Sequence, residues 1–393
     1  MKEKILNLMI QIFNSITPKK SNKIIFRSEP DYSDNSKAFY KYLYDNHRDR
    51  YDLVWIVKSD TIFQLLRKNN IKVYKRNSIK GLIEFCRAKY IVSTHAQFAN
   101  LKNHNQVYIN LWHGMPLKNI GFLEKKEIVG EKYLIEEKKK FAKMDYIIST
   151  SKTTRLAMSS VFYTDIRCIH VTGQPRNDFL FLRNNKEILS KCVKGLELNK
   201  YKKIIMCIPT FRVGLGKHDG NSFLNNMLNL QQYKEDSLND FLRENDYLLL
   251  IKFHPFEEAF FKGDNFSNIK ILDSKVLSEN LITLNEIMNI ADLLITDYSS
   301  VYFDYLLLHR PIIFTNTDEK EYIKNRGFIF DNPDFWRPGP KVNTLDNLVL
   351  EIKKLLSSEM YYKYERETIS SLVNTYTDNN SSKRIYEIIF NKD

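Results

Sequence analysis

The sequence is poor in the residues that mark several common protein classes. Its 393 residues include only four cysteines, twelve glycines and ten prolines. The cysteines lie far apart without a Cys-x-x-Cys pair, so neither a disulfide framework nor a zinc site is indicated, and a reducing cytosol is favoured. So few glycines and prolines, with 43% hydrophobic residues along the chain, exclude a low-complexity protein. A folded chain of this length has room for two domains.

Several segments that define function are also missing. No apolar run reaches the roughly 18 residues that a membrane span needs, and no signal peptide is indicated at the start. The sequence has no Asp-x-Asp pair, no Walker-type loop and no Gly-x-Gly-x-x-Gly. Metal-anchored sugar-nucleotide chemistry, ATPase chemistry and dinucleotide binding therefore lose support. We expect no metal site and no cofactor.

Positive charges exceed negative charges by 13, which favours an anionic partner. No basic recognition helix or RNA-binding signature is present, so we expect no nucleic acid. Residues 1–20 place Ile5, Met9, Ile12 and Phe13 at helical spacing, followed by two lysines. This amphipathic helix either lies in a membrane interface, with its lysines on anionic headgroups, or packs on the first domain.

From residue 23, short β-branched or aromatic runs alternate with longer amphipathic stretches, which predicts an α/β fold of two Rossmann-like domains. We expect domains at 21–185 and 200–375, and a helix at 376–393 that can cross back onto the first domain. Carboxyl ends of strands would then line a cleft between the two halves, where we expect the active site. The predicted strands are Lys23–Arg27, Leu53–Val57, Ile71–Tyr74, Tyr90–Ser93, Val107–Leu111, Tyr146–Ser149 and Cys168–Thr172, then Ile204–Ile208, Leu248–Phe253, Ile269–Leu272, Leu293–Thr296 and Ile312–Thr315.

Two histidines follow predicted strands and are candidate proton-transfer groups. His113 lies in a Trp-His-Gly-Met-Pro loop after one apolar run, and His254 precedes a proline after another. An imidazole titrates near neutrality, so a positioned histidine can take a proton from a hydroxyl. An isolated His-Gly is more often structural, but one histidine at the edge of each domain favours a shared site. We interpret the other six histidines as structural or surface residues.

A strand, a tight turn and a helix are predicted around Asp297, Ser299 and Ser300. At the start of a helix, hydroxyls and unpaired backbone N–H groups can hold a phosphate or diphosphate. For the serines alone, an ordinary helix cap is the better interpretation. The expected position of this turn, opposite the histidine loop in a two-domain α/β enzyme, favours a phosphate site instead. Arg212 follows another predicted strand and could supply the cationic partner of that diphosphate.

Taken together, six segments in order resemble the CDP-glycerol glycerophosphotransferase family of teichoic acid primases and polymerases. No single segment is specific, but their ordered coincidence is. The segments are LWHGMPLKNIG (111–121), GQPRND (173–178), IPTFR (208–212), IKFHP (251–255), ITDYSSVYFDYLLLHRPIIF (295–314), and RGFIFD with RPGP (326–331 and 337–340).

The resemblance implies a glycosyltransferase-B-like fold with an acceptor-side first domain and a nucleotide-donor second domain. His113 is then the base, and His254 stabilises or protonates the phosphate. The donor, CDP-glycerol or CDP-ribitol, would be held by Thr210, Arg212, Asp297, Ser299 and Ser300, and the further cleft candidates are Gly114, Lys118, Arg176, Asp178 and Arg326.

The resemblance further implies a peripheral enzyme on the cytoplasmic face of the membrane, with an undecaprenyl-linked acceptor and an anionic lipid surface as partners, and it is compatible with an oligomer. Met115 stands where the family usually has threonine, and Phe211 where it has tryptophan, which leaves acceptor and polyol choice open. The length favours a primase, a short polymerase or a capsule relative. A sugar-nucleotide glycosyltransferase or epimerase, and a non-catalytic membrane-associated module, remain alternatives.

Overall fold

The computed structural model divides the chain into two compact units. It describes residues 2–124, 129–183, 185–193, 196–210, 213–214, 217–218, 227–254, 257–258, 266–317, 319–325 and 327–391. Unit 1 contains Met1–His113, Ile120–Phe181 and Thr375–Asp393, and unit 2 contains Gly114–Asn119 and Leu182–Asn374.

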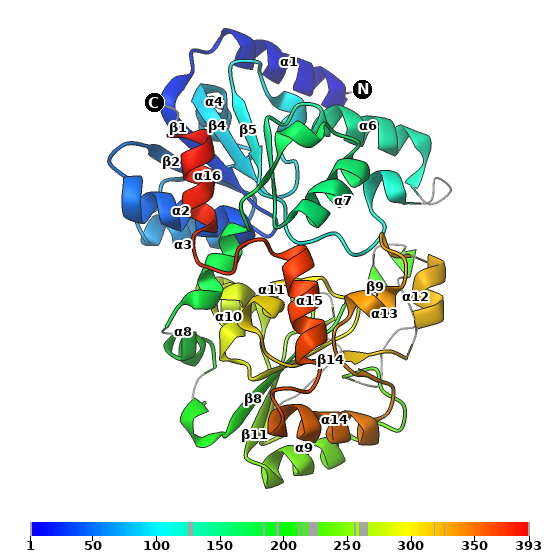
Figure 1. Ribbon diagram of the computed structural model, residues 1–393. Helices are drawn as coiled ribbons and strands as arrows, with labels where there is room; N and C mark the ends of the chain where they lie inside the picture. Colours follow the sequence, from blue (N-terminus) through cyan, green and yellow to red (C-terminus); the bar gives the residue numbers. More distant parts are fainter. Residues whose placement is uncertain are drawn as a thin grey trace. The chain divides into compact units, whose positions relative to one another are not determined.

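Unit 1 is built on a seven-stranded parallel sheet with the order β3-β2-β1-β4-β5-β6-β7 (Figure 1). The strands are β1 Lys20–Arg27, β2 Asp52–Val57, β3 Val73–Lys75, β4 Ala88–Ser93, β5 Val107–Asn110, β6 Tyr146–Ser149 and β7 Ile169–Val171. All seven strands predicted for this half are present, although β3 lies two residues later at its start. The strand order reverses between β1 and β4, and in such sheets ligands bind at the carboxyl ends beside this switch point.

The helices of unit 1 begin at sites that the local sequence favours. Ser151 and Thr154 form a reciprocal capping box at α7, and the Ser59 and Ser78 side chains cap α3 and α4. The helices are α1 Lys2–Ile16, α2 Asp34–His47, α3 Asp60–Lys68, α4 Ile79–Arg87, α6 Glu131–Phe141, α7 Lys152–Phe162 and α16 Ser381–Ile389, with 3₁₀ turns η1 Ala99–Leu101, η2 Gly121–Leu123, η3 Ile166–Cys168 and η4 Pro175–Phe181.

The C-terminal helix α16, drawn in red in Figure 1, packs against α2 and η4. The Tyr386 ring stacks on His47 at 3.9 Å between centroids, and Phe390 contacts Phe39 at 6.0 Å. Residues more than 330 positions apart in the sequence therefore share one core. Within the described part of the chain, no helix has the length and apolar content to cross a bilayer.

Unit 2 repeats the same strand order in a six-stranded parallel sheet, β12-β11-β8-β13-β14-β15, so its switch point lies between β8 and β13. The sequence predicted five of these strands and missed β15, which has only two residues. The strands are β8 Lys203–Ile208, β11 Tyr247–Ile251, β12 Ile269–Ile271, β13 Leu293–Thr296, β14 Ile312–Thr315 and β15 Lys341–Val342, with a separate antiparallel pair, β9 Val213–Gly214 and β10 Lys217–His218.

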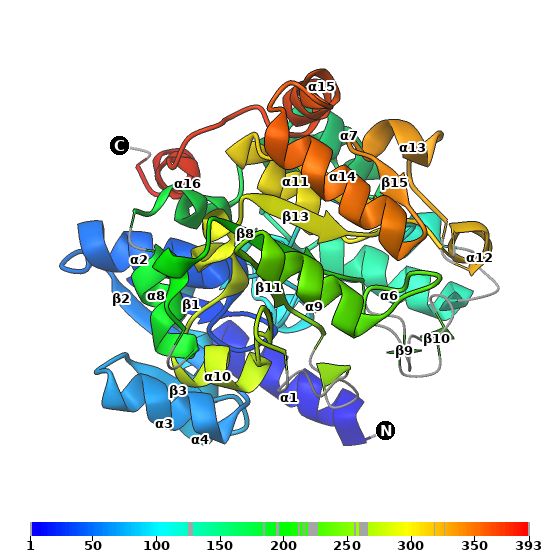
Figure 2. The same ribbon diagram turned by 90° about the horizontal axis from the view of Figure 1, so that it is seen from below.

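Helices α9 and α14 contact each other and pack on the sheet of unit 2 (Figure 2). Apolar side chains of both helices and of β8, β11 and β13 form one buried core cluster. The helices of this unit are α8 Asn185–Cys192, α9 Glu235–Glu244, α10 Ser274–Glu279, α11 Val301–Tyr305, α12 Glu319–Asn325, α13 Pro333–Trp336, α14 Leu345–Ser357 and α15 Lys363–Val373, with 3₁₀ turns η5 Leu198–Lys200, η7 Leu284–Glu286, η8 Met288–Ile290 and η9 Leu306–Leu308.

Candidate active site

The loop that carries His113 leaves β5 with an unusual backbone. Trp112 has a φ of 56°, which a bulky residue rarely adopts, and Gly114 has a φ of 140°. Such conformations persist only where surrounding contacts enforce them. The Trp112 ring is held against Phe162 at 4.5 Å between centroids. The loop therefore presents His113 in a fixed way.

Three successive carbonyl groups of this loop are bound by side chains from elsewhere in unit 1. The Asn35 amide donates to the carbonyls of Leu111 (3.3 Å) and Trp112 (2.9 Å), and its oxygen accepts from the Arg176 backbone N–H at 2.9 Å. The Arg176 guanidinium donates to the His113 carbonyl at 2.9 Å and to Asp34 at 3.1 Å. Arg176, a predicted cleft residue, thus holds the histidine loop.

The protonation of the His113 ring follows from its hydrogen bond. Nδ1 lies 3.1 Å from the carbonyl oxygen of Thr94. A carbonyl can only accept, so in the neutral ring Nδ1 carries the proton and Nε2 has the lone pair. Burial, followed by the neighbouring His95, lowers the pKa of His113 to about 3. His113 is therefore a neutral imidazole at physiological pH, with its lone pair on Nε2.

His95 lies directly on this ring and was not singled out by the sequence. Its imidazole stacks on that of His113, with centroids 3.9 Å apart and planes 3° apart. His95 follows β4, one strand from His113 in the sheet, so only the strand order brings the two together. A histidine two residues after a predicted strand was the available signal. Asp34 and Asn35 were also missed, because nothing local distinguishes them from an ordinary helix start.

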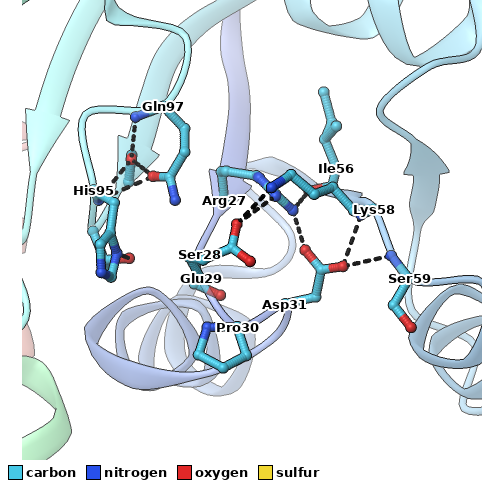
Figure 3. A network of polar contacts seen from close by, with 12 residues as sticks. Arg27, Ser28, Glu29, Pro30, Asp31, Ile56, Lys58, Ser59, His95 and Gln97 are labelled. Atoms are coloured by element: carbon cyan, nitrogen blue, oxygen red, sulfur yellow. Dashed lines mark hydrogen bonds and ion pairs between the residues drawn. The ribbon is translucent and has the colours of Figure 1, made fainter. Parts of the chain in front are cut away.

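The loops after β1 and β2 are joined by a network around Arg27, whose side chain is fully buried (Figure 3). The guanidinium forms ion pairs with Asp31 and with Glu29, the latter at 3.2 Å. Asp31 also accepts from the backbone N–H groups of Lys58 and Ser59, both at 2.7 Å. This network fixes the β1 side of the switch point in unit 1.

The predicted cleft residue Asp178 has a structural contact. Its carboxylate accepts from the backbone N–H groups of Ser381 and Ser382, both at 2.9 Å, at the start of α16. Burial raises the pKa of Asp178, which these hydrogen bonds oppose. An acceptor at a helix N-terminus satisfies N–H groups that lack a partner within the helix. Asp178 therefore holds α16 on unit 1.

In unit 2, the predicted donor residues Thr210 and Asp297 form a clasp across the switch point. Asp297 Oδ1 accepts from the Thr210 N–H (2.8 Å), the Thr210 hydroxyl (2.5 Å) and the Tyr298 N–H (2.6 Å). Both side chains are buried. The clasp fixes the loops after β8 and β13, where the strand order predicts a ligand.

Ser299 and Ser300 follow this clasp and are partly buried. Ser300 occupies the N-cap position of α11, but its side chain makes no capping hydrogen bond. The ordinary cap function that the sequence left open is therefore not what its hydroxyl performs.

A pocket opens beside the clasp in unit 2. Its lining combines apolar side chains with the buried carboxylates of Glu257 and Asp297. It is lined by Pro209, Thr210, Met227, Leu228, Asn229, Phe253, Glu257, Asp297 and Thr315.

His254 follows β11 and is partly buried. Burial and then the nearby Lys252 lower its pKa, with a smaller contribution from Lys118 and an opposing one from Glu258.

Lys118 pairs with Phe328 in an isolated β-bridge, and Asn119 donates to the Gly327 carbonyl at 3.2 Å. The segment after Gly114 thus joins the RGFIFD segment within unit 2.

The sequence suggested that the two predicted histidines occupy equivalent positions in the two units. The structure shows that they do not. β5, before His113, lies two strands from β1 on the β4 side, whereas β11, before His254, borders β8 on the opposite side of its switch point. The topological counterpart of Asp297 in unit 1 is the Thr94–His95 loop. That each histidine closely follows the end of a strand does not determine where its strand lies in the sheet.

Two predicted site residues, Arg212 and Arg326, lie outside the described residues. Among the residues that are described, no group of three or more His, Cys, Asp or Glu side chains is placed to hold a metal ion.

Two parallel sheets with the same strand order, each with polar and titratable side chains at its carboxyl edge, are typical of an α/β enzyme that binds its ligands there. The family model described as CDP-Glycerol:Poly(glycerophosphate) glycerophosphotransferase matches residues 9–391. The chain therefore belongs to this family of glycerophosphotransferase enzymes.

Individual relatives match over nearly the whole chain. The teichoic acid poly(glycerol phosphate) polymerase of Bacillus spizizenii W23 is 30% identical, over 98% of this chain and 99% of that protein. The teichoic acid glycerol-phosphate transferase of Staphylococcus aureus is 30% identical, over 94% of this chain and 93% of that protein. A solved structure of the wall teichoic acid polymerase TagF, a histidine-to-asparagine variant soaked with CDPG, is 27% identical with a TM-score of 0.79, over 99% of this chain and 94% of that one.

Proposed function

We propose that this enzyme transfers glycerol phosphate from CDP-glycerol to a hydroxyl of a lipid-linked cell-surface polymer in teichoic acid synthesis, and releases CMP. The observation that carries this proposal is the end-to-end similarity to two relatives named for glycerol phosphate. The position at the unit 2 switch point, where the Thr210–Asp297 clasp joins the loops after β8 and β13, supports a site for the donor.

In the proposed reaction, the acceptor oxygen attacks the β-phosphorus of CDP-glycerol. A new P–O bond forms as the bond from the β-phosphorus to the bridging oxygen breaks, and CMP leaves with that oxygen. His113 takes the acceptor's proton at Nε2, since Nδ1 is engaged with the Thr94 carbonyl. The balance needs no oxidant, reductant or covalent enzyme intermediate, and we propose no cofactor.

Unit 2 would hold the donor. The Ser299 and Ser300 hydroxyls and the adjoining N–H groups suit the diphosphate, while Thr210 and Asp297 keep the two loops in place. His254 would stabilise charge on the transferred phosphate or protonate the leaving group. In this proposal the two units are the acceptor and donor halves of a glycosyltransferase-B-like enzyme, as the similarity to TagF supports.

We propose that α1 places the enzyme on the cytoplasmic face of the membrane. Polar side chains dock the helix: Asn14 is fully buried and donates to the Leu101 carbonyl and to Gln106, both at 2.8 Å, and Gln11 donates to the Asn100 carbonyl. The opposite, apolar face is exposed, which suits the interfacial region of an anionic bilayer. That face comprises Ile5, Leu6, Leu8, Met9, Ile12, Phe13 and Ile16, each 40–73% exposed.

The membrane interpretation of the sequence predicted that both lysines after α1 contact anionic headgroups, but one of them contacts unit 1 instead. The Lys19 ammonium donates to the Cys86 carbonyl and to Asn14, both at 2.7 Å, so it fastens the end of α1 to unit 1. Lys20 is exposed.

The function is tested by incubating the purified enzyme with radiolabelled CDP-glycerol, CDP-ribitol or a UDP-sugar and a short lipid-linked acceptor. We expect stoichiometric release of CMP and growth of the acceptor with CDP-glycerol. Growth with CDP-ribitol alone would change the polyol but keep the reaction class. Transfer from the UDP-sugar alone would establish the rival sugar-nucleotide glycosyltransferase. The length distribution of the product separates a primase from a polymerase.

A further inference from the structure

His95 belongs to a loop whose backbone is held in strained conformations. The two residues on either side of Gln97 have left-handed backbones, Ala96 with a φ of 56° and Phe98 with a φ of 65°. A non-glycine residue in this region costs free energy, and such residues concentrate at functional sites. The strain gives the turn after β4 a shape that an ordinary loop would not keep.

Hydrogen bonds within the loop fix the His95 backbone. Its N–H donates to Gln97 Oε1 at 3.0 Å, and the Gln97 N–H donates to Ser93 Oγ at 3.2 Å. The Tyr108 hydroxyl, from β5, donates to the Gln97 carbonyl at 2.5 Å. The loop is thus anchored to the strand that precedes His113.

The two imidazoles share the residue between β4 and His95. Thr94 binds His113 Nδ1 through its carbonyl at 3.1 Å and His95 Nδ1 through its hydroxyl at 2.8 Å. One residue therefore sets the rotation of both rings, and the rings meet in a parallel stack at 3.9 Å. His95 is the more exposed of the two, and the stack places its ring over one face of His113.

We propose that His95 is a positioning residue for the transfer reaction: its ring covers one face of the His113 imidazole, fixes the plane of that ring and shields it from water. The inference rests on the proposed role of His113 as the base. A base whose ring can rotate loses the alignment of its lone pair with the acceptor hydroxyl, and such misplacement lowers rates without weakening donor binding.

The charged groups around the pair are Asp34, Glu29, Arg176 and Arg27. The carboxylates favour the protonated form of His95, and the two arginines disfavour it. Asp34 and Arg176 act on His113 in the same opposed directions. These contributions are present with or without the His95 ring, whereas the electrostatic effect of His95 itself, which lowers the pKa of His113, is lost in both His95→Ala and His95→Phe. The difference in His113 titration between these two variants therefore reports the shielding.

The test compares His95→Ala, which removes the ring, with His95→Phe, which keeps a flat ring of similar reach, and uses the exposed His104→Ala as the matched control. We expect kcat to fall about 10- to 100-fold in His95→Ala at unchanged KM for CDP-glycerol, and to stay near the wild-type value in His95→Phe and His104→Ala. Thermal unfolding of each variant shows that it is folded.

A substrate-free measurement accompanies the kinetics. In an NMR titration of ¹³C-labelled histidine rings, we expect the pKa of His113 to rise toward 6.5 in His95→Ala, because water reaches the ring, and to stay low in His95→Phe. Wild-type kcat and an unshifted His113 in the alanine variant would overturn the inference. So would equal losses in both variants, because the imidazole itself would then be required.

The outcome is separable from that of the proposed function. If the wild-type enzyme does not use CDP-glycerol, the proposed function fails, while the titration still reports whether the ring shields His113. If His113→Asn abolishes turnover and the His95 variants behave as wild type, the function stands and the role of His95 is refuted.

Discussion

At the scale of single residues, the proposed chemistry depends on which nitrogen of His113 carries its proton. The Thr94 carbonyl assigns the proton to Nδ1, and burial beside His95 keeps the ring neutral. In unit 2, a single oxygen of Asp297 accepts three hydrogen bonds and so determines the position of two loops. Both arrangements place a polar group where a strand ends.

Loss of either predicted catalytic histidine should reduce activity far more than stability. We expect His113→Ala and His254→Ala each to lower the rate by about two to four decades, as loss of a proton-transfer or charge-stabilising group does. Initial rates of CMP release, measured beside thermal unfolding curves, check this expectation. Near-normal turnover in one variant would remove that histidine from the mechanism, and the exposed His104→Ala serves as the control.

The lowered pKa of His113 makes stability depend on pH in a definite direction. The folded protein binds this proton at a pKa of about 3, and the unfolded chain at 6.5. The contribution of the neutral His113 ring to the free energy of unfolding is therefore complete above pH 6.5 and is lost as the pH falls toward 3.

Urea unfolding of the wild type and of His113→Asn at pH 7.5, 6 and 5 measures this contribution. The wild type should lose more unfolding free energy on acidification, with a difference in slope of up to about 1.4 kcal/mol per pH unit. Parallel slopes would contradict the assignment of a neutral, partly buried imidazole.

At the scale of elements, helix α2 contacts the histidine loop directly although the two are far apart in the sequence. The Asn35 side chain in its first turn satisfies two carbonyls of that loop and the Arg176 N–H, although 76 residues separate it from Leu111. Removing a buried amide leaves its partners without hydrogen bonds, which costs more than an exposed hydrogen bond.

Two asparagines of α2, one buried and one exposed, therefore provide a test variant and its matched control. Asn35→Ala should destabilise the protein by about 1–3 kcal/mol and lower kcat. Asn46→Ala, which removes an exposed hydrogen bond to the Tyr42 carbonyl, should change neither appreciably. Denaturant unfolding and initial rates give the two quantities. An Asn35 variant that is destabilised but fully active would limit this residue to the fold.

The polar docking of α1 permits a sharper test of membrane binding than deletion of residues 1–20, which would remove Asn14, Lys19 and the first residue of β1. Ile5→Gln, Met9→Gln and Ile12→Gln together change only the exposed face, because these side chains are 53%, 62% and 55% exposed. The matched control replaces other exposed apolar residues of unit 1, Ile79→Gln with Leu156→Gln.

We expect the triple variant to be lost from sedimented anionic vesicles and the control to bind as the wild type does, with binding weakened by salt. Turnover of a soluble acceptor should stay unchanged while the rate on a vesicle-embedded acceptor falls. Unchanged vesicle binding would place the membrane contact elsewhere on the basic surface.

At the scale of the whole molecule, two sheets with one strand order provide two switch points, one spanned by a polar clasp and one bordered by a buried ion-pair network. Arg27 and Asp31 join loops in unit 1, and Thr210 and Asp297 join loops in unit 2. Hydrogen bonds and ion pairs that hold these loops reduce the ordering that a bound ligand would otherwise impose.

Donor identity should appear as a change in the stability of the entire chain. A ligand at about 100 times its dissociation constant stabilises the folded state by about 2.7 kcal/mol. We expect CDP-glycerol to raise Tm and UDP-sugars to leave it unchanged, and Ser299→Ala with Ser300→Ala to reduce the rise. Differential scanning fluorimetry measures the effect. A rise with UDP-sugars alone would favour the rival donor class.

The sequence by itself determined the longer strands of both sheets and the reaction family, and it singled out His113, His254 and the segment around Asp297 as candidate site residues. These properties are readable because β-branched runs, turn residues and ordered motifs are local features of the chain. Short strands such as β15 carry too few residues to produce a pattern.

Only the tertiary structure decided which side chains meet. The order of strands in the sheet brings His95 onto His113 and separates the positions of His113 and His254 about their switch points. The packing of α16 on unit 1 places its first residues beside Asp178, 203 residues earlier in the sequence. The tertiary structure also turns the polar face of α1 toward the rest of unit 1. Such pairings depend on long-range strand order and on which polar groups need partners when buried, and neither is encoded in the local periodicity of the chain.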